Sequence, residues 1–226
     1  MPTKPLDKLL SAISKDDRAT VRQLIKQNPS LSTEAIPVAK LYQNEIFHWI
    51  YVGDTALHLA SAGYRVEIVR ELLAAGSDPN AATNHRRSTP LHYASDGYIV
   101  GPAWNEARQL KTISALLDAG ARINAQDKNG ATPLHRAVRT RCAAAVHLLL
   151  ASGADPLLRN NPGSTPFHLA VQNTGRGGSG SEQSRGAQKK IVQEFLAFPV
   201  SPELKDGRGK SVRECAGRTW IRELFD

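Results

Sequence analysis

Thr132-Pro133-Leu134-His135 is one of four nearly identical tetrapeptides in this chain of 226 residues. The other three are Thr55-Ala56-Leu57-His58, Thr89-Pro90-Leu91-His92 and Thr165-Pro166-Phe167-His168. Their threonines are 34, 43 and 33 residues apart, so a unit of about 33 residues recurs, once with about ten residues added. Such units cannot bury an apolar face alone. The spacing therefore predicts a stack of repeats.

The residues around each tetrapeptide resemble an ankyrin repeat. One unit reads GDTALHLA at 53–60, VEIVRELL at 66–73 and AGSDPN at 75–80, and a second follows the same pattern at 130–135 and 149–155. The resemblance implies an all-α fold, an ankyrin-repeat solenoid of helix-turn-helix units with β-hairpin-like fingers. It also implies a concave binding groove formed by the fingers and the first helix of each unit.

Local chemistry supports the same helices. Each threonine is placed to accept from the free N–H groups of a first helical turn, and proline follows three of the four. Gly76, Gly120 and Gly153 are expected to end the second helices, because glycine tolerates a positive φ. The histidines are expected to be structural and to bond to threonine or to the backbone of the next unit.

We expect one domain over 1–226, with about five repeats and a C-terminal capping half-repeat. The expected boundaries are a degenerate N-terminal repeat at 5–30, an insertion at 31–50, repeats at 51–83, 84–126, 127–159 and 160–205, and a cap at 206–226. The terminal units depart from the pattern because one side of each faces water.

Three insertions, at 31–50, 97–108 and 174–187, distinguish this chain from a plain stack. The one at 97–108 is apolar enough to fold back onto the helices, whereas the glycine- and serine-rich residues 174–181 are typical of a flexible linker. The first insertion brings together Tyr42, Phe47, Trp49 and, just after it, Tyr51. These aromatic residues either anchor a partner or cap the end of the core, and both interpretations stay open.

The chain carries 29 lysines and arginines against 21 acidic residues, a net charge of +8 that favours an acidic partner. The excess is spread along the chain, so no basic arm is predicted. On the family geometry, the predicted partner-binding residues lie on fingers, on first helices and beside the first insertion: Trp49, Tyr51, His85, Arg86, Arg87, Lys128, Asn129, Arg139, Arg141, Asn161, Arg208 and Lys210. Ordinary solvated charge is the competing interpretation.

No catalytic residue, metal ligand or cofactor site is predicted. Metal ligands converge to about 2 Å from one ion, whereas equivalent histidines of stacked units lie about 8–10 Å apart. The GRGGSG of residues 175–180 has the letters of a dinucleotide fingerprint but lacks the preceding strand and the following helix. Cys142 and Cys215 are isolated, so we expect two reduced thiols.

These observations predict a non-catalytic module that binds another protein with an acidic or mixed surface, in an adaptor, inhibitor or effector role. The alternative is a cationic groove that binds a polyanion, nucleic acid or an anionic membrane surface, although no nucleic-acid motif favours it. We expect a monomer. We also expect a cytoplasmic location, because no stretch has the length of a membrane span or the pattern of a signal peptide. The sequence leaves a nuclear location or secretion as an effector open.

Overall fold

The computed structural model describes residues 4–42, 46–97, 104–172 and 182–226. They belong to two compact units, the first formed by residues 1–94 and 101–122 and the second by residues 95–100 and 123–226. The expectation of a single domain over the whole chain stays a prediction. Within the described residues, no helix is long and apolar enough to cross a membrane.

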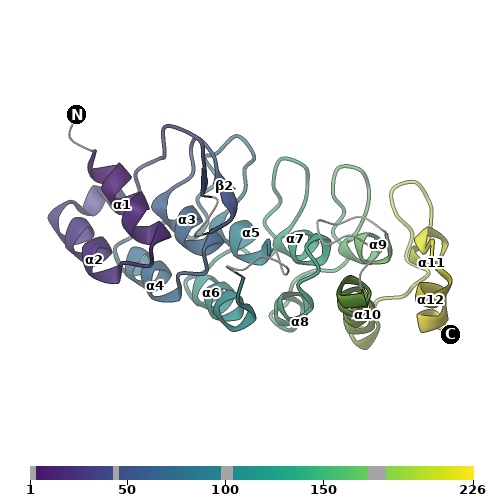
Figure 1. Ribbon diagram of the computed structural model, residues 1–226. Helices are drawn as coiled ribbons and strands as arrows, with labels where there is room; N and C mark the ends of the chain where they lie inside the picture. The colour runs from purple at the N-terminus through teal and green to yellow at the C-terminus, as the bar shows by residue number, and fades with distance from the viewer. Residues whose placement is uncertain (1–3, 43–45, 98–103, 173–181) are drawn as a thin grey trace. The chain divides into compact units, whose positions relative to one another are not determined.

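The first unit is built from helix pairs and one small hairpin (Figure 1). Helix α1 contacts α2 and α3, while α4 contacts α2, α3 and α6, so successive pairs stack. The elements are α1 (Pro5–Ser14), α2 (Arg18–Gln27), the 3-10 helix η1 (Pro29–Ser32), β1 (Lys40–Tyr42), β2 (His48–Ile50), α3 (Ala56–Ala62), α4 (Val66–Ala74), α5 (Pro90–Ser95) and α6 (Glu106–Asp118).

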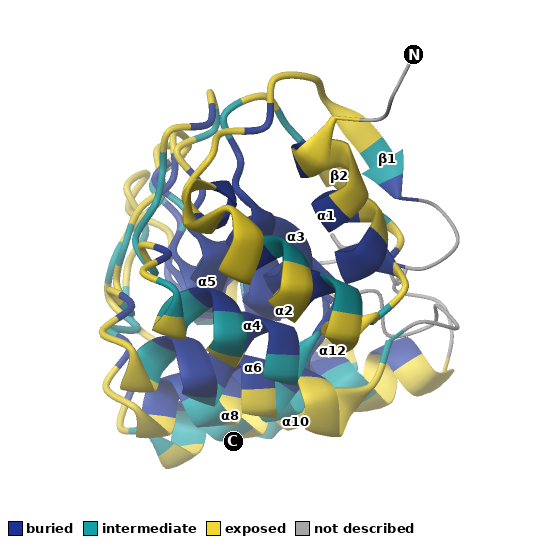
Figure 2. Ribbon diagram, turned by 90° about the vertical axis from the view of Figure 1, so that its left-hand side faces the viewer, coloured by how far each residue is buried: buried dark blue, intermediate teal, exposed yellow. Residues whose placement is uncertain are grey.

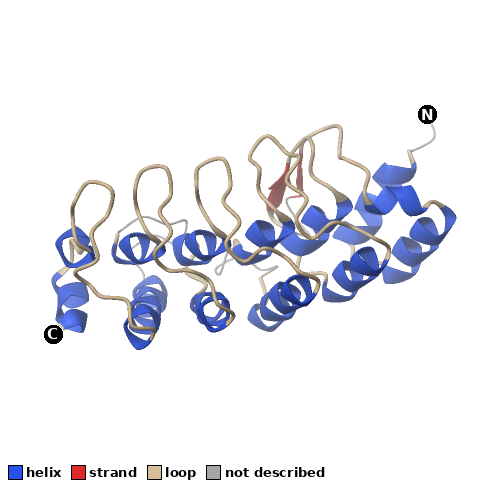
Figure 3. Ribbon diagram, turned by 180° about the vertical axis from the view of Figure 1, so that it is seen from behind, coloured by secondary structure: helices blue, strands red, loops and turns tan. Residues whose placement is uncertain are grey.

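The second unit repeats this arrangement. Helix α7 contacts α8 and α9, α10 contacts α8 and α9, and α11 contacts α9. The elements are α7 (Pro133–Arg139), α8 (Ala143–Ala151), α9 (Pro166–Val171), α10 (Glu182–Ala197), α11 (Val212–Cys215), α12 (Thr219–Arg222) and the 3-10 helix η2 (Glu223–Phe225). Loops preceding α7, α9 and α11 project on one side of this unit as the expected fingers (Figure 3).

Leucine, isoleucine and phenylalanine side chains fill the core of each unit. Leu57 and Leu72 of the first unit are fully buried, and Phe167 stacks on Phe195 in the second with ring centroids 4.8 Å apart. Burying one such side chain contributes about 1.5–3 kcal/mol. Stacking buries the apolar face that each helix pair presents to its neighbour, as the repeat spacing predicts.

The Thr-x-x-His boxes behave as reciprocal caps, which confirms the prediction for the histidines. The Nδ1 of His135 accepts from the N–H of Thr132 at 3.1 Å, so the proton of the neutral ring is on Nε2. That Nε2 donates to the carbonyl of Ser164 in the next finger at 3.1 Å. His58 and His168 make the same link to the next finger, and each imidazole therefore joins a helix start to the neighbouring repeat.

Two expected boundaries need correction. Helix α6 begins at Glu106, inside the insertion predicted at 97–108, because the Asn105 side chain caps it by accepting from Arg108 N–H. Helix α10 begins at Glu182, inside the insertion predicted at 174–187, while the linker predicted at 174–181 lies outside the described residues. The described fingers are turns without paired strands, apart from one isolated bridge between Lys205 and Ser211.

Candidate protein-interaction surface

The first insertion folds into an antiparallel hairpin in which Leu41 pairs with Trp49. Its base is closed by Ile36, whose N–H donates to the Asp54 carbonyl and whose carbonyl accepts from Gly53 N–H. The hairpin lies beside α1 (Figure 2). This closure holds the described residues of the hairpin in fixed positions.

Strand alternation divides the aromatic residues of the insertion between two faces. Tyr42 and Ile50 point inward and are 7% and 0% exposed, whereas Trp49 is 47% exposed and Phe47 is 44% exposed. Because side chains alternate along a strand, one face of the hairpin covers the core and the other meets solvent. Tyr42 therefore caps the core, while Phe47 and Trp49 are exposed to solvent.

Large exposed apolar side chains concentrate here. Of the five that the described residues contain, four belong to this segment, and we call them the hairpin patch: Val38, Phe47, Trp49 and Val52. The sequence analysis did not predict Val38 and Val52 as site residues. The signal that could have found them was the presence of apolar residues in a segment without helical or strand periodicity. Exposed large apolar side chains concentrated in one short segment of a folded domain are typical of an interaction site.

The finger of residues 84–88 is joined to the end of the hairpin by Tyr51 and Arg86. The Nη1 of Arg86 donates to the Tyr51 hydroxyl at 2.7 Å, and its guanidinium carbon lies 5.0 Å from the ring centroid. His85 meets the same ring edge to face, with centroids 5.2 Å apart. Five residues predicted from the sequence thus lie on one short stretch of hairpin and the adjacent finger: Trp49, Tyr51, His85, Arg86 and Arg87.

A buried carboxylate fixes the backbone beneath Tyr51. Asp54 is fully buried, and its Oδ2 accepts from Tyr51 N–H and from the Tyr93 hydroxyl, both at 2.7 Å. Burial and the neighbouring Asp54 charge raise the pKa of Tyr93, so its hydroxyl stays protonated. Burial lowers the pKa of His58, whose Nε2 lies 3.8 Å from Asp54 Oδ1. These groups hold the hairpin against the helices and are closed to a partner.

The fingers turn acceptor side chains inward. In each described turn, a side-chain oxygen accepts from backbone N–H groups two and four residues later, as Asp127 Oδ1 does from Asn129 at 2.8 Å and from Ala131 at 3.0 Å. Equivalent acceptors are Asn84, Asp206 and Asn160, the last with one bond because Pro162 has no N–H. The carboxylates of Asp127 and Asp206 are thereby occupied by their own loops.

Cationic residues of the same fingers point outward. Arg87, Lys128, Arg208 and Lys210 are exposed, and Arg86 is partly exposed. Within the described part of the chain, none of these five forms an ion pair with a carboxylate. Their charge is therefore available to a ligand, whereas outer-helix arginines such as Arg22 and Arg70 are paired with glutamates.

Arg87 occupies a backbone position where the other fingers have glycine. Its φ is 53°, and the equivalent Gly130, Gly163 and Gly209 have φ of 71°, 89° and 80°. A non-glycine residue in this left-handed region costs on the order of 1–3 kcal/mol. Such strain concentrates at binding sites. An exposed arginine at a position where glycine would be unstrained therefore indicates a role in binding.

In the second unit, the predicted residues lie on neighbouring fingers. Asn161 N–H donates to the Asn129 carbonyl at 2.9 Å, and the Asn161 amide donates to the Lys128 carbonyl at 3.0 Å. Asn161 therefore ties two fingers together and is itself exposed, as are Lys128, Asn129, Arg208 and Lys210.

Two predicted contact residues prove to be structural. Arg141 is 2% exposed, because its guanidinium donates to the carbonyls of Ala170 and Gln172 at the end of α9, so its prediction as a groove residue is wrong. Burial lowers its pKa to about 10. Arg139 is 43% exposed but also donates to the buried Asp96 at 3.4 Å, which gives it a structural role besides any contact.

Both ring nitrogens of His58, His135 and His168 are engaged in the caps and interrepeat bonds described above. Across the described ranges, no group of three or more histidine, cysteine or acidic residues is placed to hold a metal ion. Cys142 is buried and Cys215 partly buried, and both are free thiols.

Comparison with known proteins identifies the family. Three family models match, described as ankyrin repeats in three copies (residues 9–100), a single ankyrin repeat (86–128) and ankyrin repeats in many copies (116–170). Together with the stacked helix pairs, they show that this chain belongs to the ankyrin repeat family. Ankyrin repeats form protein-interaction modules.

Several curated proteins share the repeats. The chain is similar to the E3 ubiquitin-protein ligase KEG of Arabidopsis thaliana, with 28% identity over 70% of this chain and 9% of that protein. It is 35% identical to human Ankyrin repeat and SOCS box protein 6 and 37% identical to human B-cell lymphoma 3 protein, in each case over 45% of this chain. Those matches cover 23% and 21% of the two human proteins, so the likeness is confined to a minor part of each relative.

Proposed function

We propose that this chain is a non-catalytic module that binds a partner protein through the hairpin patch and the adjoining finger of residues 84–88. The observation that carries the proposal is the contact between Tyr51 and Arg86, which holds an arginine and an aromatic ring beside the exposed Trp49. Tryptophan, tyrosine and arginine are the residues most enriched at interface hot spots.

Preorganisation supports this function. Asp54 and the hydrogen bonds of Ile36 fix the hairpin, and Arg86 is held against Tyr51 before any partner arrives. A surface that is already ordered loses little conformational entropy on binding, so a few anchors are enough for affinity. The outward cations of the finger then favour a partner with an acidic or mixed surface.

A polyanion is the competing ligand, because the finger cations would also attract phosphates. The apolar surface of Phe47, Trp49 and Val38 favours a protein, since it is buried by apolar side chains of a partner. Binding to DNA or RNA would show a steep decrease of affinity with salt, as phosphate contacts release counterions. That result would favour polyanion binding over protein binding as the function.

The test uses capture from the native source followed by titration of the purified partner. Trp49→Ala combined with Arg86→Glu is expected to weaken binding by about 30-fold or more, as for loss of a hot spot of about 2 kcal/mol. The matched control combines Leu157→Ala and Lys111→Glu, which alter an exposed leucine and an exposed lysine outside the surface.

Both double variants should keep the helicity and melting temperature of the parent, because all four side chains are partly or largely exposed. If the two double variants bind the captured partner with equal affinity, the proposal that this surface binds the partner is wrong.

A further inference from the structure

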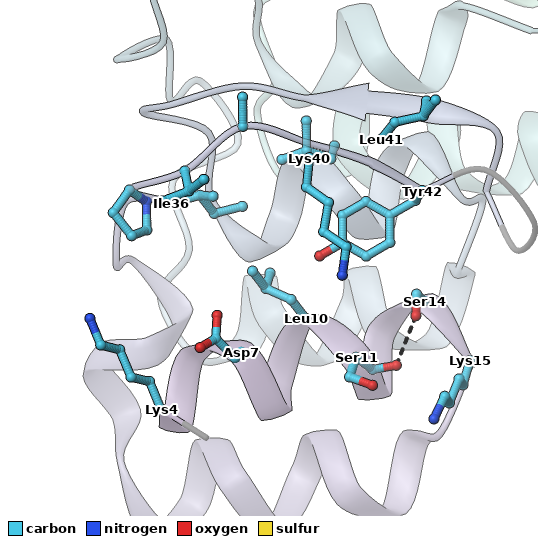
Figure 4. Close-up of a pocket in the computed structure, with 14 residues that line it drawn as sticks. Lys4, Asp7, Leu10, Ser11, Ser14, Lys15, Ile36, Lys40, Leu41 and Tyr42 are labelled. Carbon is cyan, nitrogen blue, oxygen red and sulfur yellow. Dashed lines mark hydrogen bonds between the residues drawn. The ribbon is translucent and has the colours of Figure 1, made fainter. Parts of the chain in front are cut away.

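A groove of about 780 Å³ lies between α1 and the inner face of the hairpin (Figure 4). Side chains of α1, among them Leu10 and Asp7, point toward the hairpin, while Lys40 and Tyr42 point back toward α1. Its volume falls in the range of roughly 300–1,000 Å³ typical of ligand sites. The groove depends on the inserted hairpin, so a plain helix-turn-helix repeat does not supply it.

The floor of the groove is apolar and its rim is cationic. Leu10, Ile36, Tyr42 and Ile50 lie beneath the groove and are each no more than 7% exposed, and the more exposed Pro37, Val38 and Leu41 complete its apolar lining. Three exposed lysines line the groove against one acidic residue: the lysines are Lys4, Lys15 and Lys40, and the acid is Asp7. In the described part of the chain none of these four is in an ion pair, and the Lys40 ammonium lies over the Tyr42 ring, 5.0 Å from its centroid.

The length of the groove indicates what fits in it. Lys4 and Lys15 flank the ten residues of α1, a helix of about 15 Å. An extended chain rises about 3.3 Å per residue, so about five residues span that distance. The groove is also continuous with the hairpin patch, because Val38 belongs to both and Leu41, which lines the groove, pairs with Trp49.

We infer that the groove binds an extended segment of the partner protein in which acidic side chains flank a large apolar side chain. This inference rests on the proposed function and specifies part of the partner. The apolar side chain lies over Leu10 and Tyr42, and the acidic ones lie near Lys4, Lys15 and Lys40. Charge complementarity favours this occupant over a basic peptide, and the apolar floor favours it over a nucleic acid.

The experiment begins with a displayed library of random dodecapeptides selected on the whole chain. Enriched peptides are expected to combine acidic residues with leucine, isoleucine or phenylalanine. The strongest of them is then labelled and titrated by fluorescence anisotropy. Lys40→Glu is expected to weaken its binding at least tenfold, and so is Ser11→Trp, which places a large ring in the groove without altering charge.

Lys8→Glu is the matched control, since Lys8 is exposed on the same helix but does not line the groove. Its effect should stay within about twofold, as expected of a screened surface charge. Circular dichroism of each variant shows whether α1 is retained. Lys40→Glu alters charge and Ser11→Trp alters shape. If one of the two variants fails to fold, the other still tests the groove.

The inference is overturned if no peptide is enriched, if the enriched peptides lack acidic residues, or if Lys40→Glu and Ser11→Trp bind them as tightly as Lys8→Glu does. A polyanionic oligonucleotide that displaces the peptide and binds more tightly would also overturn it. Failure of the groove is distinguishable from failure of the interaction surface. If the groove inference alone fails, the purified partner binds the Lys40 and Ser11 variants as tightly as the parent and binds the Trp49 and Arg86 double variant more weakly. If the interaction surface fails, the partner binds all of these variants as tightly as the parent.

Discussion

The Nη2 of Arg136 lies 2.6 Å from Oδ2 of Asp127, and both side chains are almost inaccessible to solvent, at 7% and 2% exposure. The guanidinium of α7 thereby holds the base of the finger that precedes the helix. Burial alone would raise the pKa of Asp127, but the hydrogen bond and charge of Arg136, with two backbone N–H groups, bring that pKa below its ordinary value. The pair is therefore charged at neutral pH.

Removing Arg136 should be costly, because it leaves Asp127 and Asp96 as buried carboxylates without their shared cation. Arg136→Ala is expected to lower the free energy of unfolding by about 3–5 kcal/mol in urea denaturation. Arg139→Ala is the control, since Arg139 is 43% exposed and its ion pair with Asp96 has an N–O distance of 3.4 Å, so a loss of about 1 kcal/mol or less is expected. Similar losses for both variants would contradict a buried role for Arg136.

Finger packing depends on Gly163, where two fingers approach closely. A Cβ at this position would lie 2.8 Å from the Cα of Gly207, whereas a Cβ at Gly153 would meet open space, although φ is 89° at both. Gly153→Ala should therefore cost about 1 kcal/mol for the backbone alone. Gly163→Ala should cost a further ~1–3 kcal/mol for the clash. Thermal unfolding of the two variants separates the backbone cost from the steric cost of the Cβ clash. Equal melting temperatures would show that the clash with Gly207 has no measurable cost.

Buried histidines should make stability fall in mild acid. Burial lowers the pKa of His135 to about 4, so the unfolded chain, with an ordinary histidine pKa near 6.5, takes up the proton first. The contribution is complete above pH ~6.5 and is lost as the pH falls toward ~4, on the order of 3 kcal/mol in total. His135→Gln can still accept from Thr132 N–H but has no titrating ring. Its free energy of unfolding should change less between pH 7 and pH ~5 than that of the parent, and an unchanged slope would contradict the assignment.

Arg87 allows strain and binding to be separated. Arg87→Gly and Arg87→Ala both remove the charge, but only glycine relieves a φ of 53°. The glycine variant is expected to be more stable than the alanine variant by about 1 kcal/mol in chemical denaturation. Both should bind the partner more weakly than the parent by the same factor. A glycine variant with full affinity would show that the strained arginine does not serve binding.

The repeats were predictable because they are local. Thr132 and His135 are three residues apart, and a cap of that span depends only on the first turn of its own helix. Gly76 and Gly153 each follow shortly after a leucine pair, and this local pattern predicts the left-handed backbone conformation that both adopt. The prediction of Trp49 and Tyr51 as site residues followed from aromatic residues in an insertion expected beside the groove, and the proposal for them now rests on the contacts of Arg86.

The sequence by itself determined that this chain repeats a helix pair, where each first helix begins and which residues form its core, since those features follow from spacing and from capping chemistry within a few residues. Only the tertiary structure decided which side of the hairpin each aromatic residue faces, that Arg141 is buried against the end of α9, and that Lys4 and Lys15 at the two ends of α1 and Lys40 of β1 rim one groove. The reason is that burial and charge neutralisation depend on partners distant in the chain, and no local pattern records which of several arginines or aromatic rings will find one.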